Sequence, residues 1–365
     1  MKVKEKTQDL NLKTHNVDLS RYYPPEWAIQ LVTWLSWPHN EKEWGKQRLS
    51  KIRDFYIQLI SQILDFQNVN LILANERLLD EVETIYKLSK QISKKKFKCK
   101  KIIIPNNDIW IRDYGPFFIK KTQNNKKRSC ILDFEFNSWG EKFPPWNLDN
   151  YVPGEIALYK GIEIESYPIV LEGGSIEFSG DGLILTTEQC LLNKNRNPNL
   201  NKQQIESYLR STFNIEEIIW LNRGLEGDHT DGHIDDVARF IGPRKILICK
   251  SNDSKDKNYK HLSESIRYLK DWKHPKHGYK LDIVELPMPD EMKIKNKRLP
   301  NSYANFIFVN GGVIIPMFNC SSDKVAVDIF KEIFPNRKIV GIDCTLLIQE
   351  GGGLHCMTRQ EPLIK

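Results

Sequence analysis

The sequence has no run of about 18 uninterrupted apolar residues, the length that a membrane-spanning helix requires. We therefore expect no contact with a membrane. Its first 20 residues lack the apolar stretch of a secretory signal, and its seven cysteines show no C-x-x-C spacing. An odd number of scattered cysteines without such a signal is typical of a cytoplasmic protein with reduced thiols. Each cysteine is then either core filler or a reactive thiol.

Segments rich in proline, glycine and serine that would act as linkers are also lacking along the 365 residues. We expect residues 1–20 to be an N-terminal tail and residues 21–365 to form a single domain. The net charge of +7 comes largely from two lysine-rich runs, at Lys94–Lys101 and Lys293–Arg298. Such runs are usually solvated loops or helix ends, and no nucleic-acid-binding motif accompanies them. We expect no nucleic-acid partner.

Helical and strand patterns alternate along the chain, which predicts an α/β fold. Helices are expected over residues 42–64, 75–92, 201–213, 257–272 and 323–333, and strands over 69–74, 101–105, 216–221, 244–250 and 281–287. Short segments bearing glycine or aspartate recur between them: RDYGPFFI from residue 112, LEGGSIEF from 171, HIDDVARFI from 233, VNGGVIIPMF from 309 and QEGGGLHC from 349. This recurrence indicates one domain of five related units.

The densest polar segment, LEGDHTDGHIDD at residues 225–236, contains His229 and His233 four residues apart, with Asp231 and Asp235 between and beyond them. Histidine and carboxylate ligands favour zinc or iron, so one interpretation is a metal-dependent hydrolase. Two glycines within the segment argue against a helix that would align both histidines. A polar loop with structural aspartate caps is the plainer alternative.

A third interpretation joins distant segments around Cys356 as a nucleophile. A thiol nucleophile needs a general acid and base, and His233 is a candidate. Asp235 lies two residues further on, so on a strand both side chains would face one side. Asp113 lies three residues after Trp110, and a carboxylate beside an aromatic face can hold a planar guanidinium. A core aromatic is the alternative for Trp110. Acidic residues concentrated around the motifs of a basic protein suit a small cationic substrate.

Motifs over nearly the whole length carry a resemblance. They are PPEWAIQLVTWLSWPHNEKEW from residue 24, NDIWIRDYGPFF from 107, LEGGSIEFSGDGLILTTEQCLLNKNRNP from 171, GDHTDGHIDDVARF from 227, NSYANFIFVNGGVIIP from 301 and GGGLHCMTRQEP from 351. The chain resembles the agmatine deiminases and bacterial peptidylarginine deiminases of the guanidino-group-modifying pentein superfamily. The resemblance implies a pentein five-bladed α/β propeller, with fivefold pseudosymmetric ββαβ units around a central active site.

The resemblance also implies roles for particular residues. Cys356 is the expected nucleophile and His233 the general acid and base, Asp113 and Asp235 bind the guanidinium, and Glu172 supports His233 or the substrate. Trp110 packs on the guanidinium, and Trp139 is a further expected substrate contact. The implied reaction passes through a covalent thiouronium on cysteine and uses no metal or organic cofactor. Its product would be N-carbamoylputrescine, on the route to putrescine and other polyamines.

Two departures from the family pattern bear on the substrate. Agmatine deiminases usually read GGxNxHC, whereas Gly353 stands at the Asn position, and some have an acid where this chain has His229. Asp228 and Asp231 are expected to attract the distal ammonium of agmatine instead. Agmatine is the expected substrate, with peptidylarginine, free arginine, amidino transfer and a non-catalytic pentein as alternatives. The sequence leaves open whether copies associate into a homo-oligomer.

The histidine next to the expected nucleophile has a separate prediction. If residues 349–356 are extended, the side chain of His355 points to the face opposite Cys356. The glycines before Cys356 are expected to let the backbone approach a flat guanidinium closely, because they carry no Cβ atom.

Overall fold

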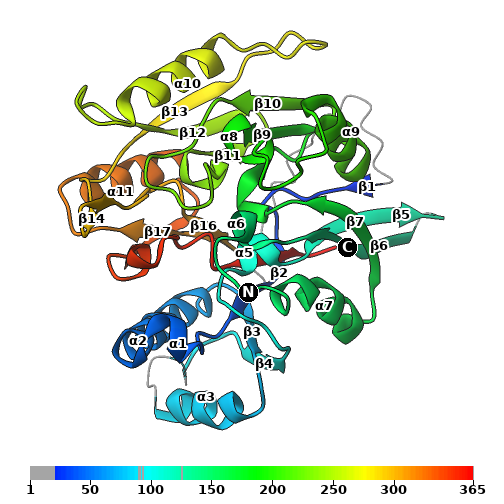
Figure 1. The fold of residues 1–365 in the computed structure, drawn as a ribbon, viewed down its shortest axis with the longest axis vertical. Helices are drawn as coiled ribbons and strands as arrows, with labels where there is room; N and C mark the ends of the chain where they lie inside the picture. Colours follow the sequence, from blue (N-terminus) through cyan, green and yellow to red (C-terminus); the bar gives the residue numbers. More distant parts are fainter. Residues whose placement is uncertain (1–20, 89–91, 93, 125, 365) are drawn as a thin grey trace, which may run out of the picture.

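The structure, a computed structural model, describes residues 21–88, 92, 94–124 and 126–364, so the expected N-terminal tail at 1–20 lies outside the described residues. The predicted alternation of helices and strands is confirmed (Figure 1). Five sheets repeat one pattern, in which an antiparallel pair of strands is followed by a helix and a third strand parallel to the second.

Four of these units run consecutively from residue 117 to residue 343. In order they are β5 (Phe117–Gln123), β6 (Lys126–Glu135), α7 (Val152–Lys160) and β7 (Glu163–Val170); β8 (Ile176–Phe178), β9 (Leu183–Thr187), α9 (Lys202–Phe213) and β10 (Glu217–Leu221); β11 (Ala238–Gly242), β12 (Lys245–Lys250), α10 (Tyr259–Asp271) and β13 (Asp282–Pro287); β16 (Ile307–Val309), β17 (Gly312–Met317), α11 (Ser322–Ile333) and β18 (Lys338–Asp343). The expected helices and strands in this region are confirmed to within two residues.

The fifth unit joins the two ends of the described chain. The last strand, β19 (Arg359–Pro362), pairs antiparallel with β2 (Gln30–Ser36), and β2 leads through α2 (Lys46–Ile63) to the parallel strand β3 (Asn68–Leu73). A further helix and strand extend this sheet, α3 (Arg77–Leu88) and β4 (Cys99–Ile103). Because β19 begins three residues after Cys356, this pairing anchors the candidate nucleophile to the first unit.

The helix expected over residues 42–64 is interrupted. It forms α1 (Glu41–Trp44) and then α2, with Gly45 between them at φ +71°, a left-handed value that ends the first helix. Along α2 the buried side chains follow helical spacing, as the sequence predicts: Leu49, Ile52, Phe55, Tyr56, Leu59, Ile60 and Ile63. Their apolar face packs on the sheet of β2 and β3 and contributes to the largest hydrophobic core.

The remaining elements are short. They are β1 (Arg21–Tyr22), which pairs with β5; the β14 (Lys293–Ile294) and β15 (Lys297–Arg298) hairpin; the helices α5 (Ile111–Tyr114), α6 (Ser138–Glu141) and α8 (Glu188–Leu191); and the 3-10 turns η1 (Asp149–Tyr151), η2 (Gly173–Ser175), η3 (Ile234–Asp236) and η4 (Leu347–Glu350). Three of them meet, since α5 contacts η2 and η2 contacts η3. This meeting point carries the site.

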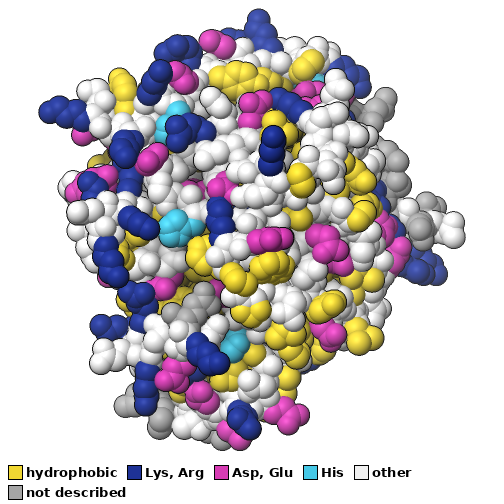
Figure 2. Space-filling view, in the orientation of Figure 1, with side chains coloured by type: hydrophobic (Ala, Val, Ile, Leu, Met, Phe, Trp, Pro, Cys, Tyr) yellow, Lys and Arg dark blue, Asp and Glu magenta, His cyan; other side chains and the backbone are white. Residues whose placement is uncertain are grey.

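Three further properties of the described residues concern surface charge, membrane-spanning helices and cysteines. On the face seen in Figure 2, lysine and arginine side chains are interleaved with aspartate and glutamate. Among the described residues, no helix has the length and apolar character needed to cross a bilayer. All seven cysteines are free.

Candidate active site

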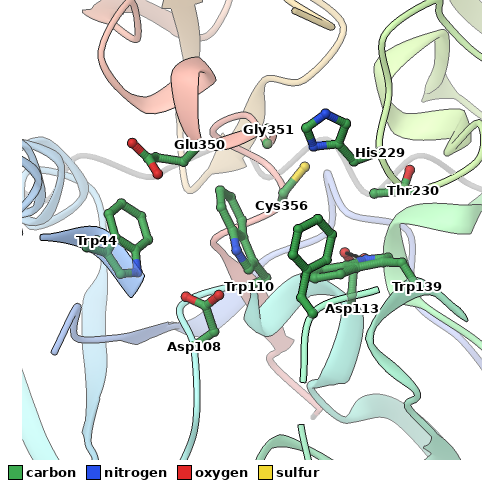
Figure 3. A pocket seen from close by; sticks show the side chains of 12 residues that line it. Trp44, Asp108, Trp110, Asp113, Trp139, His229, Thr230, Glu350, Gly351 and Cys356 are labelled. Carbon is green, nitrogen blue, oxygen red and sulfur yellow. Dashed lines mark hydrogen bonds between the residues drawn. The ribbon is translucent and has the colours of Figure 1, made fainter. Parts of the chain in front are cut away.

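A pocket of about 550 Å³, counted to its open mouth, leads to Cys356. Its lining consists of Trp44, Asp108, Trp110, Asp113, Trp139, Phe143, His229, Thr230, Glu350, Gly351, Gly352 and Cys356. Figure 3 shows Trp110 between two groups of side chains, with Trp44, Asp108 and Glu350 on one side and Asp113, Trp139 and Cys356 on the other. The pocket therefore joins aromatic surfaces with carboxylates at two separate places.

The polar groups around the thiol come from equivalent places in the five units. Each precedes the first strand of its unit: Asp113 before β5, Glu172 before β8, His233 and Asp235 before β11, Asn305 before β16 and Cys356 before β19. Four of the five segments found by recurrence are equivalent in this sense. The exception, VNGGVIIPMF, comes after the first strand of its unit, because it covers the turn between β16 and β17 and the strand β17. The equivalent segment there is NSYANF, and sequence reasoning missed its Asn305.

Cys356 is only 5% exposed and lies in an acidic environment. Its Sγ is 3.3 Å from Asn305 Nδ2 and 3.8 Å from Asp235 Oδ2. Asp236, also missed by sequence reasoning, is held by Asn305 Nδ2 at 2.9 Å and belongs to the same cluster. Burial, followed by the charges of Asp235, Asp236 and Asp113, raises the pKa of the Cys356 thiol well above its usual value. Without a ligand the sulfur therefore stays protonated.

The neighbouring carboxyls also have raised pKa values. Burial and the proximity of Glu172 raise the pKa of Asp113 to about 7, and burial together with Asp113 raises that of Asp235 well above its usual value. No lysine or arginine forms an ion pair with Asp113, Asp235 or Asp236 in the part of the chain described here. A bound cation would reverse these shifts, because opposite charge favours the ionised form of a carboxyl. The site is thus complementary to a small cation.

His233 is fully buried beside two acids. Its Nδ1 is 3.7 Å from Asp113 Oδ1 and its Nε2 is 4.0 Å from Glu172 Oε2, and neither nitrogen has a hydrogen-bond partner among the described residues. Burial and the charge of Arg196 lower the pKa of His233 well below its usual value. A neutral imidazole with both nitrogens unengaged can accept a proton and pass it on.

His233 and Asp235 do not lie on a strand, the setting in which both side chains would face one side. His233 caps η3, a 3-10 turn, so the two side chains are not placed by strand alternation. They meet instead around Gly174, where an added Cβ would lie 2.6 Å from His233 Nδ1, 2.9 Å from Asp113 Oδ1 and 3.0 Å from Asp235 Oδ2. Only glycine leaves room for these three groups to converge. The backbone N–H of Gly174 also donates to Asp113 Oδ1 at 2.9 Å.

Arg196 links this histidine loop to Glu172, and sequence reasoning missed it although it lies in the NKNRNP motif. Its guanidinium donates to Glu172 Oε1 at 2.5 Å, to Asp231 Oδ2 at 2.7 Å and to the carbonyl of Thr230 at 2.7 Å. Asp231 is also paired with Lys142 at 2.6 Å. The other oxygen of Glu172, Oε2, keeps no partner among the described residues and faces His233.

Asp228 and Asp231, the expected amine ligands, do not line the pocket. Asp228 accepts hydrogen bonds from Thr230, Gly232 and the backbone N–H of His233, at 2.7 to 2.9 Å. It therefore acts as the aspartate cap that the plainer interpretation foresaw. The carboxylates at the far side of the pocket are Asp108 and Glu350, and Glu350 is 3.0 Å from Arg48 Nε.

The two tryptophans expected to contact substrate are both at the pocket. Trp110 and Trp139 both line the pocket, and the indole N–H of Trp139 donates to Asp113 Oδ2 at 2.9 Å. Trp139 lies in α6 at a left-handed φ of +56°. A bulky residue in this conformation is uncommon and costs roughly 1–3 kcal/mol. The hydrogen bond from the Trp139 indole compensates for this strain, because it holds Asp113, one of the carboxyls near the thiol.

The structure shows what surrounds Gly353 and His229, the two departures from the family pattern. A Cβ at Gly353 would collide with the side chain of Asn305, so the Asn305 amide beside the sulfur leaves no space for a side chain there. His229 packs near Phe143, with ring centroids 6.2 Å apart, and a Cβ on Gly351 would meet its Nδ1 at 2.8 Å. In the described residues, His229 and His233 do not belong to a common cluster of three metal-ligating atoms.

His355 does not line the pocket that leads to Cys356, although the segment is not extended as the prediction assumed. Residues 354–357 form a turn, and His355 Nδ1 is 2.7 Å from the same Asp235 Oδ2 that approaches the sulfur. Its Nε2 is 2.8 Å from Glu26 Oε2. Strand alternation fails here because the segment is not extended, so His355 lies behind Asp235.

Comparisons with known proteins found relatives over nearly the full length of this chain. The family described as Porphyromonas-type peptidyl-arginine deiminase matches residues 22–362. A putative agmatine deiminase of Legionella pneumophila is 36% identical over 97% of this chain and 98% of its own length, and the agmatine deiminase of Pseudomonas syringae pv. syringae is 31% identical over 93% and 95%. A cysteine-to-serine variant of C. jejuni agmatine deiminase, solved with substrate bound, is 34% identical, with a TM-score of 0.81 over 93% of this chain and 96% of that one.

These similarities cover almost the whole described chain, from the first unit to the strand that completes it. The fold is the pentein fold that the resemblance implied, and its five units match the five sheets described above. The chain belongs to the Porphyromonas-type peptidyl-arginine deiminase family, together with the agmatine deiminases.

Proposed function

We propose that this protein is an agmatine deiminase, which hydrolyses agmatine to N-carbamoylputrescine and ammonia. The observation that carries the proposal is the buried thiol of Cys356 among Asp113, Asp235 and Asp236, at the end of a pocket lined by tryptophans. A planar guanidinium can hydrogen-bond to two carboxylates and stack on an indole at once. The full-length relatives named agmatine deiminase support the same substrate.

The proposed reaction begins when the guanidinium enters, and Asp113 and Asp235 each release a proton and orient it as carboxylates. The cation also favours the thiolate of Cys356, whose proton passes to neutral His233. The sulfur attacks the central carbon and forms a C–S bond. His233 then protonates one nitrogen, the C–N bond breaks and ammonia leaves.

The second half of the proposed reaction uses the same groups. The covalent thiouronium is attacked by water, and His233 takes a proton from that water as it forms a C–O bond. The C–S bond then breaks, the sulfur recovers its electron pair, and the ureido product departs. Glu172, held by Arg196, keeps one oxygen directed at His233 and favours its protonated form during both transfers.

The distal ammonium of agmatine is assigned to Asp108 and Glu350, because these carboxylates line the pocket beyond Trp110 (Figure 3). Glu350 and His229 flank the same backbone, since His229 packs against Gly351. The acid that some agmatine deiminases carry at position 229 is thus replaced by an acid one residue before Gly351. An ammonium is attracted to either arrangement.

Two further parts of the proposal concern the whole protein. Residues 21–365 act as one catalytic domain, because β19 completes the sheet of the first unit and holds Cys356 in place. The protein works in a reducing, cytoplasmic environment, which the seven free cysteines support.

Ammonia release from agmatine, free arginine and an arginyl peptide, assayed side by side, tests the substrate. We expect agmatine to give the highest kcat/KM, because arginine and peptides would bring a carboxylate or a peptide chain towards Asp108 and Glu350. A higher kcat/KM on the peptide would assign the chain to peptidylarginine chemistry. Loss of agmatine turnover after chelator treatment would favour the metal-dependent alternative.

A further inference from the structure

His355 lies between two carboxylates and is 1% exposed. Its Nδ1 is 2.7 Å from Asp235 Oδ2 and its Nε2 is 2.8 Å from Glu26 Oε2. Each contact is a hydrogen bond and needs one hydrogen between its two heavy atoms. A neutral imidazole carries only one N–H, so the second hydrogen is either on a carboxyl group or on the imidazole as a second N–H.

The surroundings decide where that hydrogen lies in the empty site. Glu26 also accepts from Arg239 Nη2 at 2.5 Å and from the backbone N–H of Phe308 at 3.2 Å. Burial alone would raise its pKa, but Arg239, His355 and Arg112 together lower it. Glu26 is therefore the anion of the trio and accepts the N–H from Nε2 of His355.

Asp235, unlike Glu26, lies in surroundings that favour its protonated form. Its Oδ1 has no hydrogen-bond partner among the described residues, and burial, followed by the charge of Asp113, raises the pKa of Asp235. Burial and the charges of Arg112 and Arg239 lower the pKa of His355 well below its usual value. The second hydrogen then belongs to Asp235, whose O–H donates to Nδ1. In the empty site the order is carboxylic acid, neutral imidazole, carboxylate.

A guanidinium needs Asp235 as an anion, and the proton has a short path away from it. We propose that His355 is a positioning residue that takes the proton of Asp235 when the substrate cation binds. The O–H bond at Asp235 Oδ2 breaks and an N–H bond forms at His355 Nδ1, 2.7 Å away. The imidazolium is then held between two carboxylates, and Asp235 faces the guanidinium with a negative charge. This inference rests on the proposed function.

The groups that face this trio come from several elements, and all of them enter the proton balance. Around His355 and Asp235 they are Glu26, Asp113, Arg112, Glu177, Arg239, Asp236 and Cys356. Asp113, whose pKa is raised to about 7, also loses its proton when a cation binds. The test must therefore compare variants that differ only at His355.

His355→Gln is the discriminating variant, because the glutamine amide can accept from Asp235 and donate to Glu26 but cannot take up a proton. Both proteins carry Cys356→Ala, so that agmatine binds without turnover. Calorimetry in buffers of different ionisation enthalpy counts the protons released on binding. We expect the His355→Gln protein to release about one more proton per agmatine near pH 6.5, and its affinity to rise about tenfold more per pH unit. A purely structural role would weaken binding equally at every pH.

Equal proton counts in the two proteins would overturn the inference. If His355→Gln does not fold, ¹⁵N NMR of histidine-labelled Cys356→Ala protein replaces it. One imidazole must then become doubly protonated on agmatine binding, also in a His233→Gln background, and the absence of that change overturns the inference. Absence of agmatine turnover by the unmodified protein would instead contradict the proposed function, so the two failures are distinguishable.

Discussion

Two buried clusters of charged groups lie next to each other in this protein and are satisfied in different ways. In the lower cluster, Glu26 and Glu177 are paired with the guanidinium of Arg239. In the upper cluster, Asp113, Asp235 and Asp236 surround Cys356, and none of them has a lysine or arginine ion-pair partner in the part of the chain described. His355 connects the clusters by contacting Glu26 and Asp235.

The difference shows what the upper cluster is suited to bind. Removing a carboxylate from water is costly unless a partner replaces the lost hydration. Among the described residues, a guanidinium forms ion pairs in the lower cluster and no guanidinium forms one in the upper cluster. A guanidine substrate would pair with the carboxylates of the upper cluster as Arg239 pairs with those of the lower cluster. The same residue types therefore stabilise the fold in the lower cluster and form a binding site in the upper cluster.

The largest expected effect is on the nucleophile. Cys356→Ala should lower kcat for agmatine by at least about 10³-fold, because no other group in the pocket can form the covalent adduct. Its melting temperature should stay within a few degrees of the original, since the buried thiol is neutral without substrate. Ammonia release and thermal unfolding check both points. Residual activity above about a tenth of the original would place the nucleophile elsewhere.

A paired substitution tests the comparison directly. Asp235→Asn should lower kcat/KM by about 10² to 10³-fold but leave the free energy of unfolding unchanged or higher, because Asp235 is uncharged in the substrate-free protein and an asparagine amide can donate to His355 as its carboxyl does. Glu26→Gln should instead lower the free energy of unfolding by about 3 kcal/mol, because it leaves Arg239 with an incomplete partner set. Urea unfolding and steady-state kinetics measure these effects.

Glu76→Gln is a matched control for that pair, since Glu76 is exposed and its loss changes the net charge equally. Equal stability changes in Asp235→Asn and Glu26→Gln would contradict the distinction between the two clusters.

A smaller effect is expected at the far end of the pocket. Glu350→Gln should raise the KM for agmatine about tenfold with little change in kcat, because it removes a charge from the proposed ammonium contact. Butylguanidine, which lacks the ammonium, is the control substrate and should keep its KM. A similar rise for both substrates would remove Glu350 from amine recognition.

The smallest effect concerns pH and Asp113. Its pKa is raised from 3.8 to about 7 in the folded protein, so between these values the folded state holds a proton that the unfolded state has lost. Stability of the substrate-free protein should therefore fall as pH rises through this window. The pKa of His233 is lowered, so below its ordinary pKa this histidine makes stability rise with pH. The informative quantity is therefore the difference in stability between the original protein and a variant at Asp113.

We expect the melting temperature of the original protein to decrease relative to that of Asp113→Asn by a few degrees between about pH 4 and pH 7. Agmatine should cancel this decrease, since the bound cation favours the carboxylate. Parallel pH profiles for the two proteins would show that Asp113 is not held protonated.

Much of the fold was predictable because hydrophobic periodicity is local. The strand expected at 69–74 is β3 at Asn68–Leu73, and the helix expected at 201–213 is α9 at Lys202–Phe213. A turn containing Gly180 and Gly182 joins β8 to β9, and both glycines have positive φ, which glycine adopts readily. The break at Gly45 was missed, since the apolar spacing continues across it.

The site was predictable in its members and less so in its geometry. Cys356, Asp113 and Trp110 stood out as motif residues and line one pocket. Asn305 was missed because its segment lacks the glycine or charge that marked the others. Asp228 was assigned to substrate because sequence shows a carboxylate but not the backbone N–H groups that occupy it.

The sequence by itself determined the α/β class, the five recurrent segments and the residue types that meet the family pattern. Only the tertiary structure decided which carboxylates have a cation and which do not. That distinction depends on Arg239 reaching Glu26 from a strand 213 residues further along the chain. Local hydrophobic periodicity does not predict contacts between residues so far apart in the sequence. The pairing of buried charges is determined only when the five units pack together.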